Sequence, residues 1–323
     1  MSNMKIMVPI NNIEHVKPYV EAGADEFYLG FYDDEWTKCF GCNAEINRMS
    51  GFGKHANQYD IEQAMELINE IHKYDKSAFV TMNASSYCDE EMEHIDTFLE
   101  KLSKAKPDGI IISTATLIST VKKYNLTPVM STMAGIYNED ILKCYSDAGV
   151  DRVILPRDLT LDEITEIINS NPNIEYELFH MRNGCFFSDS HCLGAHKADR
   201  ISTCGTVGSD TYKYVCDGEF DFETTRAFDD THHASCKEWH KFACGLCALY
   251  RFNELGIGSL KIVGRADSHA SVCKDIALTK RNIEIAREAS SEEEYLKKME
   301  FPKPNLSVCA GGLSCYYPEI RFK

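Results

Sequence analysis

Residues 5–30, KIMVPINNIEHVKPYVEAGADEFYLG, decide the fold of this chain. Two short runs within it, Lys5–Ile10 and Glu26–Gly30, carry the aliphatic and aromatic residues that favour buried strands. Between them, Ile13–Glu21 has the pattern of an amphipathic helix, and Gly23 follows it as a stop signal. A strand, a helix and a second strand joined by such short connections predict two parallel strands with the helix packed outside them.

The same alternation continues to about residue 183 and returns once more near residue 260. Six further strands are expected, at residues 78–82, 109–113, 127–131, 152–156, 175–179 and 259–263. The helices expected beside them cover residues 61–74, 90–105, 116–124, 139–148, 161–169 and 275–289. About eight strands that alternate with helices fit a closed barrel better than an open doubly wound sheet. We therefore predict an α/β fold of the (β/α)8, TIM-barrel type.

Two stretches interrupt this rhythm. Trp36–Tyr59 is longer than an ordinary connection from strand to helix, and a Cys-rich insertion at about 184–242 shows little periodicity. In a barrel both would follow the carboxyl end of a strand and lie over the mouth, where active sites form. We expect one barrel domain over residues 1–289 that carries this insertion as a cap, followed by a Cys-bearing C-terminal tail over residues 290–323.

The composition is that of a globular protein, and the charge bears on its partners. The chain has 323 residues, of which 44% are hydrophobic and 26% are charged. Its 34 Lys and Arg residues against 50 Asp and Glu residues give a formal net charge of −16. Such a field repels polyanions, so we expect a small-molecule or peptide substrate and no nucleic acid.

The apolar runs of the sequence bear on its location. None approaches the roughly 20 residues that a membrane-spanning helix needs. Met1–Pro9 also lacks the apolar stretch of a secretion signal. We therefore expect a cytoplasmic protein with no membrane span.

Cysteine is the most informative residue type. Of the 14 cysteines, seven lie between residues 185 and 247: Cys185, Cys192, Cys204, Cys216, Cys236, Cys244 and Cys247. In a reducing cytosol such a concentration indicates a metal or iron–sulfur site. A [4Fe–4S] cluster needs four thiolates. The pair Cys185-x6-Cys192 is followed by Cys204 and, after a long gap, by Cys244, which gives four.

A zinc site is the main alternative. The pairs Cys39-x2-Cys42 and Cys244-x2-Cys247 have the short spacing typical of tetrahedral zinc. Zinc would explain these two pairs but would leave Cys185 and Cys192 unexplained. Ordinary small buried thiols are the role expected of three others, Cys88, Cys144 and Cys273.

Several motifs occur in an order that resembles one known family. They are Gly23–Gly30, Ser131-Thr-Met, Val153–Ile164, Glu177–His180, Cys185–Cys192 and Gly258–Arg265. Together they resemble the collagenase-like peptidase family U32 over residues 4–289. Although members are labelled peptidases, the resemblance implies oxygen-independent hydroxylation for several of them. Their implied targets are ribosomal or transfer RNA bases or ubiquinone precursors, with prephenate as the oxygen donor in some.

The resemblance also implies an iron–sulfur cluster held by four cysteines. Carried onto this sequence, the first two ligands are Cys185 and Cys192, and the last is Cys244. The third is Cys204, with Cys216 as the alternative.

Two positions depart from the pattern of the family. Val263 stands where the family has Glu, and Ser113 begins a Ser-Thr pair where an Asp is expected. Both departures remove a carboxylate near the expected mouth, so the resemblance does not fix the substrate.

The ends of the expected strands supply candidate catalytic residues, which are Asn83, Ser131, Arg157, His180 and Arg265. The two arginines could bind a carboxylate in bidentate fashion. For Arg157 the alternative is a surface ion pair with Asp158 or Glu163. His180 could act as a general acid or base, because imidazole titrates near neutrality, or it could be a structural histidine.

These observations predict an iron–sulfur enzyme that carries out oxygen-independent hydroxylation or a related redox modification. A peptidase that acts through Cys185 or through a bound metal is the second hypothesis. A third is a cluster-bearing, non-catalytic subunit that supports a homologous partner, and a homo-oligomer is also compatible with the sequence.

Overall fold

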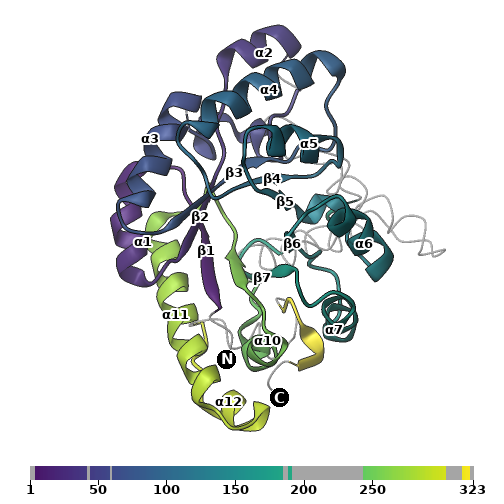
Figure 1. Ribbon diagram of the computed structural model, residues 1–323. Coiled ribbons are helices and arrows are strands. Elements are labelled where there is room, and N and C mark those ends of the chain that lie inside the picture. Colours follow the sequence, from purple (N-terminus) through teal and green to yellow (C-terminus); the bar gives the residue numbers. More distant parts are fainter. Residues whose placement is uncertain are drawn as a thin grey trace, which may run out of the picture.

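The computed structural model describes residues 4–41, 44–58, 60–184, 188–190, 243–302 and 315–320. Within these ranges the eight strands pair in chain order, all in parallel, and β1 pairs with β8 to close a barrel (Figure 1). The strands are β1 (Lys5–Pro9), β2 (Glu26–Leu29), β3 (Ser77–Met82), β4 (Gly109–Ile112), β5 (Pro128–Met130), β6 (Arg152–Ile154), β7 (Glu175–Met181) and β8 (Ser259–Ile262). The predicted (β/α)8 barrel is confirmed.

Helices surround the strands (Figure 1). They are α1 (Val16–Ala22), α2 (Asp34–Phe40), α3 (Ile61–His72), α4 (Asp89–Ser103), α5 (Thr116–Lys123), α6 (Glu139–Asp147), α7 (Leu161–Ser170), α10 (Leu249–Leu255), α11 (His269–Glu288) and α12 (Glu292–Lys298). Short 3-10 turns cover Ile13–His15, Ser50–His55, Thr132–Ala134, Leu246–Ala248 and Pro318–Ile320. The expected helices are present, and the sequence did not predict α2, α10 or α12.

In the ranges that the structure describes, no helix has both the length and the apolar character that crossing a membrane requires.

Local sequence fixes where the outer helices begin. The Asp60 carboxylate accepts a hydrogen bond from Gln63 N at 2.8 Å and caps α3. At the start of α7, Glu163 Oε2 accepts from Thr160 N at 2.7 Å in a capping box. Each such cap stabilises a helix by about 1 kcal/mol. Because these starts are fixed, the apolar faces of both helices turn toward the sheet.

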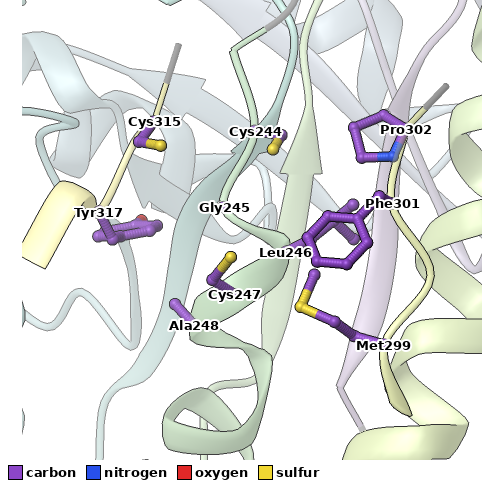
Figure 2. Close-up of a pocket in the computed structure, with 10 residues that line it drawn as sticks. All are labelled: Cys244, Gly245, Leu246, Cys247, Ala248, Met299, Phe301, Pro302, Cys315 and Tyr317. Atoms are coloured by element: carbon purple, nitrogen blue, oxygen red, sulfur yellow. The ribbon is translucent and has the colours of Figure 1, made fainter. Parts of the chain in front are cut away.

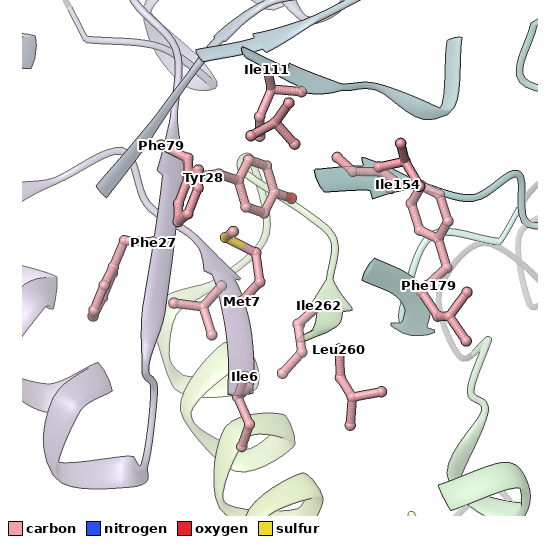
Figure 3. Close-up of a cluster of buried hydrophobic side chains, with 14 of the residues drawn as sticks. Ile6, Met7, Phe27, Tyr28, Phe79, Ile111, Ile154, Phe179, Leu260 and Ile262 are labelled. Carbon is pink, nitrogen blue, oxygen red and sulfur yellow. The ribbon is translucent and has the colours of Figure 1, made fainter. Parts of the chain in front are cut away.

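The barrel interior is solid. Met7, Tyr28, Phe79, Ile111 and Ile154 gather inside the ring of strands, and each of these side chains is at most 5% exposed (Figure 3). Successive residues of a strand point to opposite faces, so these inward side chains alternate with others that pack against the helices. The packed interior leaves the carboxyl ends of the strands as the place for a site.

A buried ion network lies toward the amino ends of the strands. Arg152 Nη2 donates to Glu26 Oε2 at 2.5 Å and to Glu177 Oε2 at 2.6 Å. Lys261 Nζ donates to the other oxygen of Glu177 at 2.6 Å. Because every carboxylate here faces a cation, the cost of burying these charges is largely offset.

The described part of the tail packs on the barrel. Tyr295 of α12 is buried and donates to Leu246 O at 2.6 Å. Residues 315–320 lie beside the end of β7, where Tyr317 Oη donates to Phe179 O at 2.9 Å. The described residues of the tail therefore pack against the outside of the barrel, while nearly all of the expected cap at 184–242 lies outside the described residues.

Candidate active site at the barrel mouth

Polar side chains from neighbouring strand ends form a hydrogen-bonded layer at the mouth. Asn83 follows β3 and Ser131 follows β5, and Asn83 Nδ2 donates to Ser131 Oγ at 3.1 Å. Arg48, from the long segment after β2, donates its backbone N–H to Asn83 Oδ1 at 3.2 Å. Two of the predicted catalytic residues therefore lie together, held in place by a segment that the sequence predicted to lie over the mouth.

Ser113 belongs to the same layer. In the parallel register Thr81 is level with Ile111, and Ile111 with Val129, so the residues two positions further on share one inward face. Ser113 is 8% exposed, and its Oγ has no hydrogen-bond partner among the described residues. A buried hydroxyl without a partner is costly, so this group is suited to bind a polar atom of a ligand.

Arg265 is a buried cation at the mouth. It is 6% exposed, and its Nη2 donates to Asn47 Oδ1 at 2.9 Å. Its Nη1 donates to Asn57 Oδ1 at 3.2 Å and to Thr81 Oγ1 at 3.1 Å. These acceptors are neutral, and within the described ranges none of the side-chain hydrogen bonds of this guanidinium goes to a carboxylate. Burial lowers the pKa of Arg265 to about 10.

Arg157 shares one buried carboxylate with a second arginine. Asp189 accepts from Arg157 Nε and from Arg48 Nη1, each at 2.7 Å. Thr132 Oγ1 donates to the same carboxylate at 2.9 Å. Burial alone would raise the pKa of Asp189, but the two guanidinium groups outweigh it and hold that pKa well below its ordinary value. Arg157 therefore has an acid partner, and that partner is Asp189.

His180 lies behind the barrel wall, apart from the other four candidates. Its Nε2 is 3.2 Å from Oγ1 of Thr279 on α11, and the side chain has no exposed surface. Burial lowers the pKa of His180 to about 3, so the imidazole is neutral at physiological pH. The described geometry favours a structural role for this residue, which was the alternative left open by the sequence.

Three cysteines line a pocket beside the end of β7 (Figure 2). Cys244 forms isolated bridges with Met181 and with Cys315. Both cysteines are buried, at 9% and 8% exposure, and Cys247 lies one turn further along the chain. Figure 2 shows the sulfur of Cys315 on the side that faces Cys244, and the sulfur of Cys247 directed toward the space between them.

Of the remaining predicted ligands, one lies far from this pocket and the others lie outside the described residues. Cys39 is exposed on α2, which lies across the barrel from α10 and the neighbouring Cys244 (Figure 1). The described residues thus do not bring the two CxxC pairs together for zinc, and no three of their His, Cys, Asp or Glu side chains are arranged to hold a metal ion. The other candidates lie outside the described residues: Cys42, Cys185, Cys192, Cys204 and Cys216.

Four residues of this site were missed in the sequence: Asn47, Arg48, Asn57 and Asp189. The first three come from the long segment after β2, and only its length marked it as functional. Asp189 lies between Cys185 and Cys192, and no sequence pattern distinguishes this single carboxylate as a site residue.

The model of the family described as peptidase family U32 matches residues 11–307. The chain belongs to peptidase family U32. Among the curated U32 relatives is tRNA hydroxylation protein P1 of Bacillus subtilis, 24% identical over 287 residues, which are 87% of this chain and 63% of that protein. tRNA hydroxylation protein P of Helicobacter pylori J99 is 24% identical over 65% of this chain and 47% of its own length. The chain spans about half the length of that relative.

A third U32 relative corrects the expectation about nucleic acid. The 23S rRNA 5-hydroxycytidine C2501 synthase of Escherichia coli K12 is 27% identical over 60% of this chain and 26% of that protein. These relatives are named for acting on tRNA or rRNA, so the prediction that nucleic acid is not a partner was wrong. The physical reason is that a net charge of −16 averages the whole surface, whereas the mouth places Arg48 and Arg157 against one carboxylate and leaves Arg265 without one.

Proposed function

We propose that this chain catalyses the oxygen-independent hydroxylation of an RNA base at the barrel mouth. The proposed cofactor is an iron–sulfur cluster bound by Cys185, Cys192, Cys244 and Cys204 or Cys216. The names of the U32 relatives support the reaction type and the class of substrate. The buried Arg265 is the structural observation that carries the proposal, because it gives the mouth a binding site for an anionic group.

The chemistry requires such a group. Replacing C–H by C–OH is a two-electron oxidation of the base, so a reaction without O2 needs an oxygen donor that accepts those two electrons. We propose that this donor is a small carboxylate whose acidic group binds Arg265. A buried guanidinium surrounded by neutral acceptors gains more from an anion than a solvated one does, because the site has little screening from water.

The layer of Asn83, Ser113 and Ser131 would then orient the second reactant. Asn83 and Ser131 are already joined by a hydrogen bond, whereas Ser113 Oγ has no partner in the described part of the chain. Amide and hydroxyl groups of this kind can pair with the edge of a base that has left its stack. The Arg48–Asp189–Arg157 arrangement would brace this layer, because Arg48 N donates to Asn83 Oδ1 and Thr132, next to Ser131, donates to Asp189.

Cys244 is the member of the proposed ligand set that lies among the described residues. It supplies a soft sulfur atom in a pocket whose other walls include Met299, Phe301 and Pro302. Thiolates are the ligands that iron–sulfur clusters use, and apolar surroundings limit access of water. When bound, the cluster would supply one-electron transfer next to the mouth.

The described geometry does not support the peptidase hypothesis. A cysteine nucleophile at 185 would need a histidine base, and the candidate His180 faces α11 with its ring fully buried. Its low pKa also makes the protonated form that completes acid–base catalysis inaccessible near neutral pH.

Nucleoside mass spectrometry tests the proposal. The chain is expressed in a host that lacks its own U32 hydroxylases, and total RNA is digested and compared with RNA from the empty host. We expect one nucleoside to gain the mass of an oxygen atom, at least tenfold less of it with Arg265→Gln, and an unchanged amount with Arg281→Gln, whose guanidinium is exposed and pairs with Glu300. Unmodified RNA from cells with iron-loaded wild-type chain would contradict the proposal.

A further inference from the structure

Tyr28 of β2 lies beneath the guanidinium of Arg265. Side chains alternate along a strand, so Tyr28 and Gly30 face the barrel interior together. A Cβ atom at Gly30 would clash with Arg265 Nη1, which means that the guanidinium occupies the inward position next above Tyr28. The Cζ atom of Arg265 is 6.0 Å from the centre of the Tyr28 ring. The phenol therefore forms a floor under the buried cation of the mouth.

A second cation holds the ring of Tyr28 from the side of the amino ends of the strands. Lys261 Nζ lies 4.0 Å from the ring centre and also donates to Glu177 at 2.6 Å. The Tyr28 side chain is 5% exposed, and Figure 3 shows its oxygen directed into the ring of strands. The direction of the phenol is thus fixed by packing.

The hydroxyl of Tyr28 is a hydrogen-bond donor that the fold does not use. It makes no hydrogen bond within the part of the chain that the structure describes. Burial raises the pKa of Tyr28 above its ordinary value, and among the neighbouring charges Arg265 opposes this rise most. The phenol is therefore protonated at neutral pH and can donate to an acceptor placed next to Arg265.

Arg265 also keeps donors for a ligand. Three of its N–H groups donate to Asn47, Asn57 and Thr81. Its Nε–H and the second N–H of Nη2 have no acceptor among the described residues. Two N–H groups of one guanidinium match the two oxygens of a carboxylate, which makes an acid group the ligand that fits.

We infer that Tyr28 is a second binding residue for the carboxylate that Arg265 holds, an inference that rests on the proposed function. The phenol donates to one carboxylate oxygen while the guanidinium binds the group as a whole. The small carboxylate therefore enters acid-first, with its acid group on the floor of the mouth and the rest of the molecule toward the layer of Asn83, Ser113 and Ser131. A neutral analogue leaves the buried cation without an anion and binds less tightly.

Calorimetric titration of the full-length chain, purified without oxygen, tests this inference. The probes are acetate and benzoate, with benzamide as the neutral counterpart of benzoate. Wild type is compared with Tyr28→Phe, Arg265→Gln and Tyr176→Phe, and the melting temperature of each protein is measured without probe. Tyr176 is the matched control, because this buried phenol lies beside α7 and donates to Asn171 O at 2.7 Å.

We expect wild type to bind benzoate more tightly than benzamide, and Arg265→Gln to lose this preference. Tyr28→Phe should bind benzoate at least about tenfold more weakly, the effect of one hydrogen bond to a charged group. Its melting temperature should stay that of wild type, since no described group loses a partner. Tyr176→Phe should behave in the opposite way, with a lower melting temperature and wild-type affinity for benzoate.

Two results would overturn this inference. One is wild-type affinity for benzoate in Tyr28→Phe, or no binding of either carboxylate to wild type. The other is a lowered melting temperature in Tyr28→Phe, which would make the phenol a structural group. If Tyr28→Phe binds benzoate as wild type does while the nucleoside assay finds oxygenated RNA, the proposed function stands without this residue. Tyr28-dependent binding of benzoate together with unmodified RNA would instead contradict the proposed function alone.

Discussion

Arg265 crosses the mouth through the space that a side chain at residue 30 would fill. A Cβ atom built on Gly30, directly after β2, would lie 2.1 Å from Arg265 Nη1. It would also lie 2.5 Å from Asn57 Oδ1, which accepts a hydrogen bond from the same guanidinium. The glycine at the end of β2 and the arginine after β8 therefore form one structural unit, although they come from opposite ends of the sequence.

Gly30→Ala should displace the guanidinium and destabilise the fold by roughly 1–3 kcal/mol, the usual cost of overpacking a buried site. Urea denaturation gives the free energy of unfolding. If the clash with Arg265 is the cause, the substitution should cost at least about 1 kcal/mol less in an Arg265→Ala background. Strictly additive effects of the two substitutions would show that Gly30 has a different role.

Arg152→Met should destabilise the chain strongly, by about 3–5 kcal/mol, because it leaves Glu26 and Glu177 buried without their shared cation. The matched control is Arg251→Met, which breaks an ion pair with Glu292 in which the arginine is 44% exposed. That substitution should cost at most about 1 kcal/mol, because water screens exposed pairs. If denaturation shows that both variants lose the same free energy of unfolding, the buried ion network contributes no more to stability than the exposed pair.

The chain should become less stable as the pH is lowered, because of His180. Its pKa is lowered to about 3 in the folded chain and lies near 6.5 when unfolded, so the unfolded state binds the proton first. The contribution is complete above about pH 6.5 and is lost as the pH falls toward 3; at pH 4.5 about 3 kcal/mol of it has been lost. His180→Gln should flatten this part of the stability profile relative to wild type. Parallel profiles for the two proteins would rule out the buried imidazole as the source.

The barrel could be predicted from the sequence because the periodicity of strands and helices is a local property. Helices α2, α10 and α12 were missed because they lie outside the regular alternation of strands and helices: α2 overlaps the long segment Trp36–Tyr59, α10 follows the Cys-rich insertion, and α12 lies in the C-terminal tail. The place of His180 was predictable in principle. It alternates with Glu177 and Phe179 along β7, and those residues face the interior, so residue 180 must face the helices.

The partners of the site residues could not be predicted in this way. Asn47 and Asn57 reach Arg265 from a long segment whose path depends on tertiary packing. The docking of Cys315 beside Cys244 likewise depends on Tyr317 and Gly245, which no spacing rule connects. The net charge of the chain did not reveal the arginines at the mouth, since an average over the whole surface says nothing about where Arg48, Arg157 and Arg265 lie.

The central claim is that thiolates bind an iron–sulfur cluster beside the barrel mouth, and a count of metals per chain tests it most directly. The full-length chain is purified without oxygen, and iron, zinc and acid-labile sulfide are measured in the same sample. The account predicts a brown protein with about four iron and four sulfide per chain, and loss of both in Cys244→Ser but not in Cys144→Ser, whose thiol is exposed on α6. A colourless protein with one zinc ion and no sulfide would contradict it.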